Sequence, residues 1–405
     1  MAMEIITATL TGACPRERGE ELGTRFGAEI REAVDGYLGF FAVRGLAEPR
    51  VREIAESCFA ALRAWAPNLA DELEATALAA EVPLWRLAAL NARTEVLAVV
   101  EPDAEGECST AVFAPAGWAP PESIQTWDWH EHLCRAGLVV SYAPDAPRRE
   151  AAAGGVVAAG GAVAAGDTAA AGGAAPAAQP PTGRPRASAG VGRVAMFTEL
   201  GVLGKIGVND AGLAVHFNIL HHASDRGVGG VPVHAIARRV LDEATTVDEA
   251  EAIIRSARAS ASTVITVLAR GEAEHRAACF EISSERVAAV RPDAEGWLVH
   301  TNNFLAPEQL PGEATRDAST TYTRLEHVSA QRPRMAGLSI EQRAREMAGE
   351  AGALAPICFR PDPSEPLHEQ WSTLLTVGFD LVAGELEYYP GSPVALAEHG
   401  ARRFG

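Results

Sequence analysis

The order of the expected helices and strands constrains the fold of this 405-residue chain more than any other feature. After a short strand at residues 3–11, apolar residues recur at helical spacing up to about residue 99, with Pro67 and Pro83 where helices end or begin. From about Cys108 onward the chain changes to alternating, β-branched runs separated by glycine turns. Because helices and strands come in blocks, the sequence favours antiparallel sheets covered by helices over a doubly wound parallel sheet.

The second half of the chain repeats this block arrangement. Two helices are expected over 234–259, where a threonine cap and acidic residues open the second one, and strands return between 262 and 304. A helical patch at about 321–350 precedes a hairpin at 371–391. Residues 151–190 are almost wholly Ala, Gly and Pro, so we expect a flexible loop between two strands, with an Ala-rich helix at 151–175 as the weaker alternative. We assign this segment no chemistry.

Charge and cysteine use exclude several classes of protein. The formal net charge of −18 repels phosphate backbones and anionic membranes, so we expect neither a nucleic acid nor a membrane as partner. The first twenty residues lack the pattern of an export signal, which favours a cytoplasmic protein. Six cysteines without a C-x-x-C spacing favour buried thiols over a zinc cage or disulfides. Lys205 is the only lysine, and a coding bias explains this better than a catalytic lysine does.

Two residues at strand positions could carry chemistry. Cys108 opens a strand after an acidic, glycine-containing loop, where a nucleophile can be presented, although a buried structural cysteine is the default interpretation. Alternation sends Trp127 and Trp129 to one face of a strand and Asp128 to the other. Such an aspartate is ordinarily solvated, and it gains significance only if its face borders a pocket.

Side-chain amides close two of the apolar runs. Asn218 ends one run, and Asn302 and Asn303 end another. An amide can donate a hydrogen bond to negative charge that develops on an oxygen, but asparagine at a strand end is also ordinary turn chemistry.

Paired histidines raise the question of a metal. The pairs 130/132 and 221/222 lack a recognised ligand spacing with supporting carboxylates, so we expect no metal site. Metal-dependent hydrolysis through these histidines remains an alternative, which a chelator would reveal.

Seven short motifs follow one another in a fixed order. They are LTGACPRERGEELG at 10–23, NARTEVL at 91–97, ECSTAVFAP at 107–115, QTWDWH at 125–130, GKIGVNDAGLAVHFNIL at 204–220, HTNNF at 300–304 and ICFRPDP at 357–363. In this order they resemble the acyl-coenzyme A:6-aminopenicillanic acid acyltransferases, also called isopenicillin N acyltransferases, within the N-terminal nucleophile hydrolases. The resemblance skips 151–190, which looks like an insertion.

The resemblance implies an α+β protein with the four-layer αββα N-terminal nucleophile hydrolase fold and antiparallel sheets. It also implies self-cleavage before Cys108, which leaves a helix-rich α-chain of residues 1–107 and a β-chain of residues 108–405 that carries the nucleophile. The freed α-amino group has a reference pKa near 8 and can act as the base for its own thiol. Acyl transfer or amide hydrolysis would then pass through a thioester on Cys108.

Roles follow for individual residues. Cys108 would be the nucleophile and, through its amine, the base, and Asp128 would orient both groups. Asn302 is the preferred donor to the oxyanion, and Asn218 the second choice. The resemblance implies no cofactor, with acyl-coenzyme A a candidate substrate and a small acyl amide or thioester as the partner molecule.

Arg324 resembles a family arginine near the substrate, but a surface ion pair with Glu326 or another acid explains it equally well. Glu107 stands where the family commonly has glycine, and Thr126 and Asn303 replace an asparagine and a histidine of the family motifs. These departures keep a second hypothesis open, an unprocessed, non-catalytic binding protein of the same fold.

Overall fold

The computed structural model describes residues 3–100, 108–117, 119–145, 190–271, 276–315 and 319–405. The expected Ala/Gly/Pro insertion, apart from residue 190, lies outside the described residues, as does Glu107 of the expected cleavage junction.

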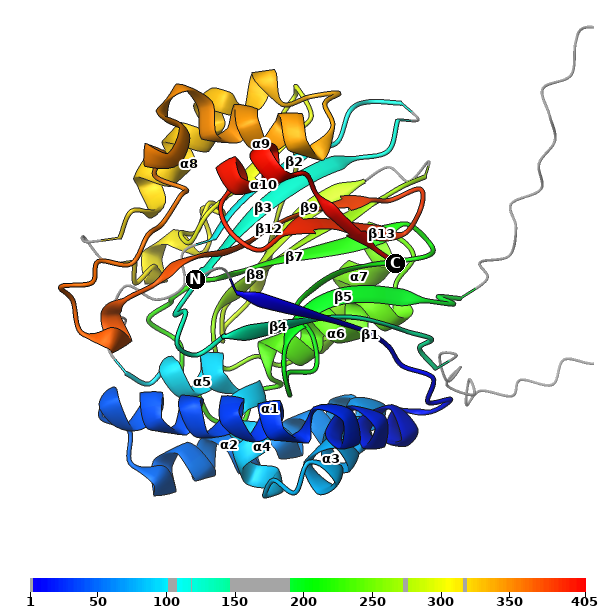
Figure 1. Ribbon diagram of the computed structural model, residues 1–405, viewed down its shortest axis with the longest axis vertical. Helices are drawn as coiled ribbons and strands as arrows, with labels where there is room; N and C mark the ends of the chain where they lie inside the picture. Colours follow the sequence, from blue (N-terminus) through cyan, green and yellow to red (C-terminus); the bar gives the residue numbers. More distant parts are fainter. Residues whose placement is uncertain (1–2, 101–107, 118, 146–189, 272–275, 316–318) are drawn as a thin grey trace, which may run out of the picture.

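Two β-sheets form the centre of the molecule (Figure 1). The eight-stranded sheet has the order β1-β4-β5-β6-β7-β8-β9-β10, and the six-stranded sheet has the order β11-β2-β3-β12-β13-β14. The strands of the first are β1 (Glu4–Thr9), β4 (Ala136–Tyr142), β5 (Val194–Glu199), β6 (Ile206–Asn209), β7 (Leu213–Ile219), β8 (Thr263–Ala269), β9 (Ala277–Ile282) and β10 (Val287–Val290). Those of the second are β2 (Cys108–Phe113), β3 (Glu122–Trp129), β11 (Trp297–His300), β12 (Ser372–Asp380), β13 (Glu385–Tyr389) and β14 (Arg402–Phe404).

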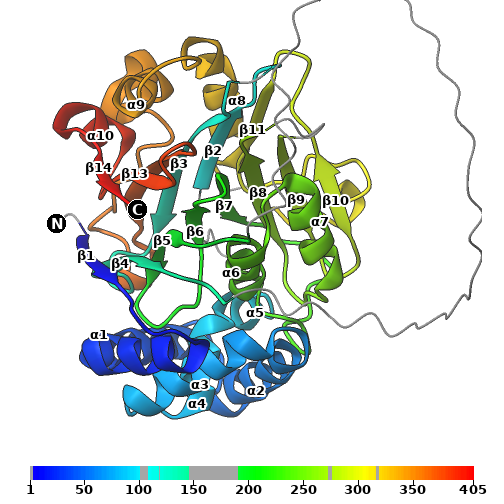
Figure 2. The ribbon, with the colours of Figure 1, turned by 90° about the vertical axis from the view of Figure 1, so that its right-hand side faces the viewer.

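Helices cover the outer face of each sheet (Figures 1 and 2). On the eight-stranded sheet lie α1 (Pro15–Val43), α2 (Glu48–Trp65), α3 (Pro67–Ala79), α4 (Leu84–Asn91), α5 (Arg93–Leu97), α6 (Val233–Glu243) and α7 (Val247–Ser256). On the six-stranded sheet lie α8 (Thr321–Gln331), α9 (Ile340–Ala348) and α10 (Pro393–His399). The predicted four-layer αββα fold is therefore confirmed.

Two details differ from the sequence prediction. The first strand pairs parallel with β4, so the eight-stranded sheet is not purely antiparallel. The helix expected over residues 85–99 is divided at Ala92, where the backbone leaves helical geometry, into α4 and α5. Asn91 next to the break donates to the carbonyl oxygen of Gly201 and accepts from the amide of Leu203, so this break ties the helices to the loop before β6.

Several local predictions are confirmed. The C-terminal hairpin pairs β12 with β13 in antiparallel register. Thr246 caps α7 by accepting from the amide of Glu249, and acidic residues occupy the first turn of that helix. Of the cysteines, Cys58, Cys108, Cys134, Cys279 and Cys358 are buried and unpaired.

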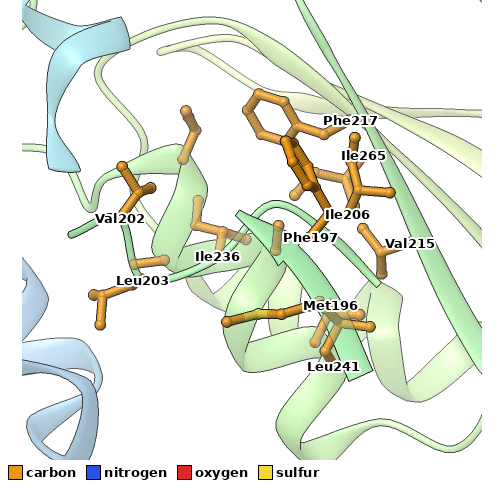
Figure 3. Close-up of a cluster of buried hydrophobic side chains, with 14 of the residues drawn as sticks. Met196, Phe197, Val202, Leu203, Ile206, Val215, Phe217, Ile236, Leu241 and Ile265 are labelled. Carbon is orange, nitrogen blue, oxygen red and sulfur yellow. The ribbon is translucent and has the colours of Figure 1, made fainter. Parts of the chain in front are cut away.

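Glycine lets α6 approach the eight-stranded sheet closely. A Cβ at Gly207 would lie 2.7 Å from that of Met196 and 2.9 Å from a methyl group of Leu241, and one at Gly204 would lie 2.5 Å from the Cβ of Arg238. Figure 3 shows Met196 and Leu241 side by side in this packed cluster. Because such contacts are far inside van der Waals distance, both positions exclude larger residues.

Candidate active site

Cys108 lies at the first position of β2, in register with Trp127 of β3. Neighbouring residues in register point to the same face, so the thiol faces the eight-stranded sheet, where Trp127 packs on Phe197 at 5.3 Å between ring centroids. Burial, together with the charge of Asp128, raises the pKa of the Cys108 thiol to about 12 against the opposing cations of Lys205 and Arg324. The thiol is thus neutral at pH 7 and needs a base to react.

The side chain of an asparagine accepts a hydrogen bond from the backbone N–H of the candidate nucleophile. The N–H of Cys108 donates to Oδ1 of Asn302 at 2.8 Å, and Nδ2 of Asn302 donates to the carbonyl oxygen of Ile219 at 2.9 Å. The structure therefore brings Asn302 and Cys108 together, with the acceptor oxygen of the amide directed at Cys108. Its role as oxyanion donor stays a prediction.

Arg324 of α8 is completely buried and lies against the same residues. Its Nη1 donates to the carbonyl oxygen of Cys108 at 2.6 Å and to the hydroxyl of Ser109 at 3.1 Å, and its Nη2 donates to Oδ1 of Asn302 at 3.0 Å. The alternative of a surface ion pair with Glu326 is wrong, because an arginine without exposed surface is not a solvated ion. Contact with a substrate stays a prediction.

Asp128 is also fully buried, so it is not the solvated residue that an exposed strand face would give. Burial and the charge of Asp128 raise the pKa of Cys358 to about 11, which places the carboxylate on the side of the outer helical layer. The same charge raises the pKa of Cys108. Alternation along β3 puts Asp128 on the face of the sheet opposite to Trp127 and Cys108, and whether it orients the amine and thiol of Cys108 stays a prediction.

Asn218 of β7 joins the two sheets. Its Oδ1 accepts from the hydroxyl of Thr110 at 2.9 Å and from Nε2 of Gln125 at 3.0 Å, and its Nδ2 donates to the carbonyl oxygens of His300 and Thr301. Four partners give Asn218 a place in the inter-sheet hydrogen-bond network. Its role as a second oxyanion donor stays a prediction.

Sequence reasoning missed two members of this network. Gln125 connects Asn218 to His216, whose Nε2 lies 2.9 Å from the hydroxyl of Ser123. Burial lowers the pKa of His216 to about 3, so the ring is neutral. The signal was present, since Gln125 opens the QTWDWH motif, but it predicted no partner for the amide.

A buried ionic cluster was missed as well. Glu199 accepts from Nη2 of Arg93 at 2.5 Å, from the hydroxyl of Tyr37 at 2.5 Å and from Nζ of Lys205 at 2.8 Å. We call these four residues the Lys205 cluster. Two signals could have found it: the single lysine of the chain and the arginine of the NARTEVL motif.

Two of the paired histidines lie in packing or hydrogen-bond contacts with neighbouring side chains. His130 is buried against Phe40, and burial lowers its pKa to about 4, while His222 contacts the hydroxyl of Ser224. Within the described ranges, no group of three or more histidine, cysteine or acidic side chains could hold a metal ion. Likewise, none of the described helices is both long and apolar enough to cross a bilayer.

Two sheets covered by helices on their outer faces form the αββα fold of the N-terminal nucleophile hydrolases. The profile of the acyl-coenzyme A:6-aminopenicillanic acid acyl-transferase family matches residues 194–395, about half of the chain. The chain belongs to this family. It is 32% identical over 142 residues to the 40 kDa form of the acyl-coenzyme A:6-aminopenicillanic-acid-acyltransferase of Emericella nidulans, a match that covers 34% of this chain and only 38% of that relative.

Solved structures give more distant matches. Penicillin V acylase from Agrobacterium tumefaciens is 12% identical, with a TM-score of 0.38 over 70% of this chain and 83% of its own. A variant of the conjugated bile acid hydrolase from Clostridium perfringens is also 12% identical, with a TM-score of 0.34 over 52% of this chain and 76% of its own.

Proposed function

We propose that this chain is an N-terminal-cysteine amide hydrolase or acyltransferase that acts through a thioester on Cys108. The observation that carries the proposal is the pair of contacts around that residue: its nitrogen donates to Asn302, and its carbonyl oxygen accepts from Arg324. Both atoms that would flank a new N-terminus are thus held by buried polar side chains. Family membership adds support, because the curated relative is named an acyltransferase.

The proposed processing breaks the peptide bond between Glu107 and Cys108. The thiol adds to the carbonyl carbon of Glu107, the acyl group moves from nitrogen to sulfur, and water hydrolyses the resulting ester. This leaves the carboxyl group on residue 107 and a free amine on Cys108. That amine occupies the position from which the backbone nitrogen now donates to Asn302, so the same acceptor would orient it.

In the proposed reaction, the amine takes the proton of the Cys108 thiol as the sulfur attacks the acyl carbonyl. Because the thiol pKa lies near 12, almost no thiolate forms by itself at pH 7, and the amine, whose reference pKa is near 8, accepts the proton while the sulfur–carbon bond forms. Asn302, with Asn218 second, would donate to the oxyanion. The amine then returns its proton to the leaving group, and water or a second amine resolves the thioester.

For the substrate we propose a small acylated amine or a β-lactam-like amide, with a thioester such as acyl-coenzyme A as an alternative acyl donor and no resident cofactor. Hydrolysis and acyl transfer share the thioester and differ only in the group that resolves it. A panel of acyl amides and acyl thioesters, assayed with and without an acceptor amine, distinguishes them.

The test combines intact-mass analysis with the Cys108→Ala variant. We expect two chains, divided before residue 108, from the unaltered protein, and one chain without activity from the variant. One full-length chain whose Cys108 does not react with an alkylating probe would instead support the non-catalytic binding protein. Activity that survives Cys108→Ala but is lost to a chelator would support metal-dependent hydrolysis.

A further inference from the structure

Lys205, the only lysine of the chain, lies on the same side of the six-stranded sheet as the candidate nucleophile. Its side chain is buried, and Nζ lies 3.3 Å from the centroid of the Trp127 ring. Trp127 is the register partner of Cys108, so ammonium and thiol share one face of the sheet. A coding bias can explain why the chain has a single lysine, but it does not explain why that lysine is buried at this position.

The Lys205 cluster carries one more positive charge than negative charge. Burial alone would raise the pKa of Glu199, but Arg93 and Lys205 outweigh it and lower that pKa, so the carboxylate is ionised. Burial lowers the pKa of Lys205 to about 8, which leaves the amine protonated at neutral pH. Arg93 is a cation at any physiological pH, and Tyr37 is neutral because burial raises its pKa well above the ordinary value.

The remaining titratable neighbours of Lys205 do not cancel this charge. Burial raises the pKa of the Cys134 thiol and lowers the pKa of His234, so both groups are neutral near pH 7. Trp129 donates its indole N–H to Tyr37 at 2.7 Å and adds no charge. The cluster therefore presents a net charge of about one positive unit, out of contact with water, beside a thiol that must become an anion.

We propose that Lys205 is a positioning residue of the acyl-transfer site, which stabilises the thiolate of Cys108 electrostatically from its fixed place between Glu199 and Trp127. This inference rests on the proposed function. The physical reason is that an opposite charge in a poorly solvated interior favours the ionised form of a nearby group. Lys205 and Arg324 are the two cations that oppose the effect of burial on Cys108, and they act from different layers of the fold.

The ion pair with Glu199 is essential to this role. A neutral amine would supply no field, and the contact at 2.8 Å keeps the proton on nitrogen despite burial. The same contact argues against a Schiff base at Lys205, since that chemistry needs an amine that is neutral and accessible to substrate. With 1% of its surface exposed, Lys205 is not accessible.

The test measures the rate at which iodoacetamide alkylates Cys108 as a function of pH in the full-length protein, with peptide mass analysis to separate this cysteine from the other five. In Lys205→Met we expect the midpoint of the rate profile to move to higher pH, so that alkylation at pH 7 slows about tenfold. Lys205→Arg keeps the charge and should restore most of the rate. A midpoint that Lys205→Met leaves unchanged overturns the inference.

A matched control removes a comparable buried cation elsewhere. Arg238→Met breaks an ion pair with Glu72, and Arg238 of α6 packs over the ring of Tyr142 of β4. This variant should therefore lose stability and keep the midpoint of the Cys108 rate profile. An equal shift in both variants means a general loss of packing and overturns the inference. Failure of Cys108 to react in the unaltered protein overturns the proposed function as well, whereas a reactive Cys108 with no shift leaves that function standing.

A second measurement needs no change at Lys205. Because the chain has one lysine, protein made with ¹⁵Nζ-labelled lysine gives a single ammonium resonance. If an anion at Cys108 and the ammonium stabilise each other, the effect is reciprocal, so protein alkylated at Cys108 with iodoacetate, which leaves a carboxylate there, should titrate Lys205 at a higher pH than protein alkylated with neutral iodoacetamide. An identical titration of Lys205 in both proteins overturns the inference.

Discussion

Arg324 donates to the carbonyl oxygen of Cys108 at 2.6 Å, although 216 residues separate them in sequence. Since Asn302 binds the nitrogen of Cys108 and also accepts from Arg324, residues of β2, of α8 and of the loop after β11 form one closed arrangement. The nucleophile is thus held at its backbone, which leaves the thiol group itself clear of these contacts.

Replacement of Arg324 should therefore misplace the nucleophile. We expect Arg324→Leu to lower kcat by about 100-fold or more, because a shift of about 1 Å at a reacting atom has that effect. Arg343→Leu is the control: Arg343 is a buried arginine of the same helical layer, but it contacts Glu122 and the carbonyl oxygen of Ser123 at the far end of β3. An equal loss of kcat at matched folded fraction in both variants would contradict the assignment.

Replacement of Asn302 should mainly lower kcat, whereas replacement of Asn218 should mainly lower the free energy of unfolding. Asn302→Ala removes the acceptor of the Cys108 nitrogen, and we expect kcat to fall about 100- to 1000-fold if its amide also serves the oxyanion. Asn218→Leu removes four hydrogen bonds between the sheets and should lower the free energy of unfolding by about 1–3 kcal/mol or more. Denaturant unfolding and steady-state kinetics on both variants check this, and a reversed pattern would exchange the two roles.

Stability should depend on pH through Glu95. Burial raises the pKa of Glu95 from 4.5 to about 7, while its Oε1 accepts from the amide of Val233 at the start of α6. Between these values the folded protein binds a proton that the unfolded chain has released, so stability falls as pH rises, by about 3 kcal/mol in total. Glu95→Gln keeps the acceptor oxygen and should flatten this dependence, as thermal unfolding between pH 4.5 and 8 would show. A slope that persists in Glu95→Gln would assign it to another group, such as Asp225.

Substitution of alanine for glycine should lower the free energy of unfolding at Gly204 and raise it at Gly39. Gly204→Ala places a methyl group 2.5 Å from the Cβ of Arg238, and we expect a loss of about 1–3 kcal/mol. Gly39→Ala lies on the exposed side of α1, where a Cβ meets nothing within 4 Å, and it should gain about 0.5–1 kcal/mol. Chemical denaturation of both variants is sufficient, and a stable Gly204→Ala protein would show that α6 can shift.

The periodic parts of the fold were predictable because they depend on local sequence. The helices up to Asn91, the inner strands and the C-terminal hairpin follow from spacing and turn residues. The parallel pairing of β1 with β4 was not predictable, since more than a hundred residues lie between the two strands. The sequence of neither strand indicates which other strand it pairs with. The same holds for Lys205: its burial depends on Tyr37, Arg93 and Glu199, which only the tertiary fold brings together.

The site residues were predictable to the extent that motifs carry them. Cys108, Asp128 and Asn302 occur in short, ordered motifs, and the structure gathers them at one end of the six-stranded sheet. The burial of Arg324 was not predictable, because an arginine on an amphipathic helix normally faces water. Its buried position depends on oxygen acceptors that β2 and the loop after β11 supply.

The Lys205 cluster crosses the proposed cleavage point, with Tyr37 and Arg93 before Cys108 and Glu199 and Lys205 after it. A cut at that point would turn an intramolecular ion cluster into a contact between subunits. The two fragments should then behave as an obligate heterodimer of fixed one-to-one stoichiometry, which co-purifies until it denatures. Residues 1–107 would in that case be a permanent subunit of the enzyme, unlike a propeptide that is released and degraded.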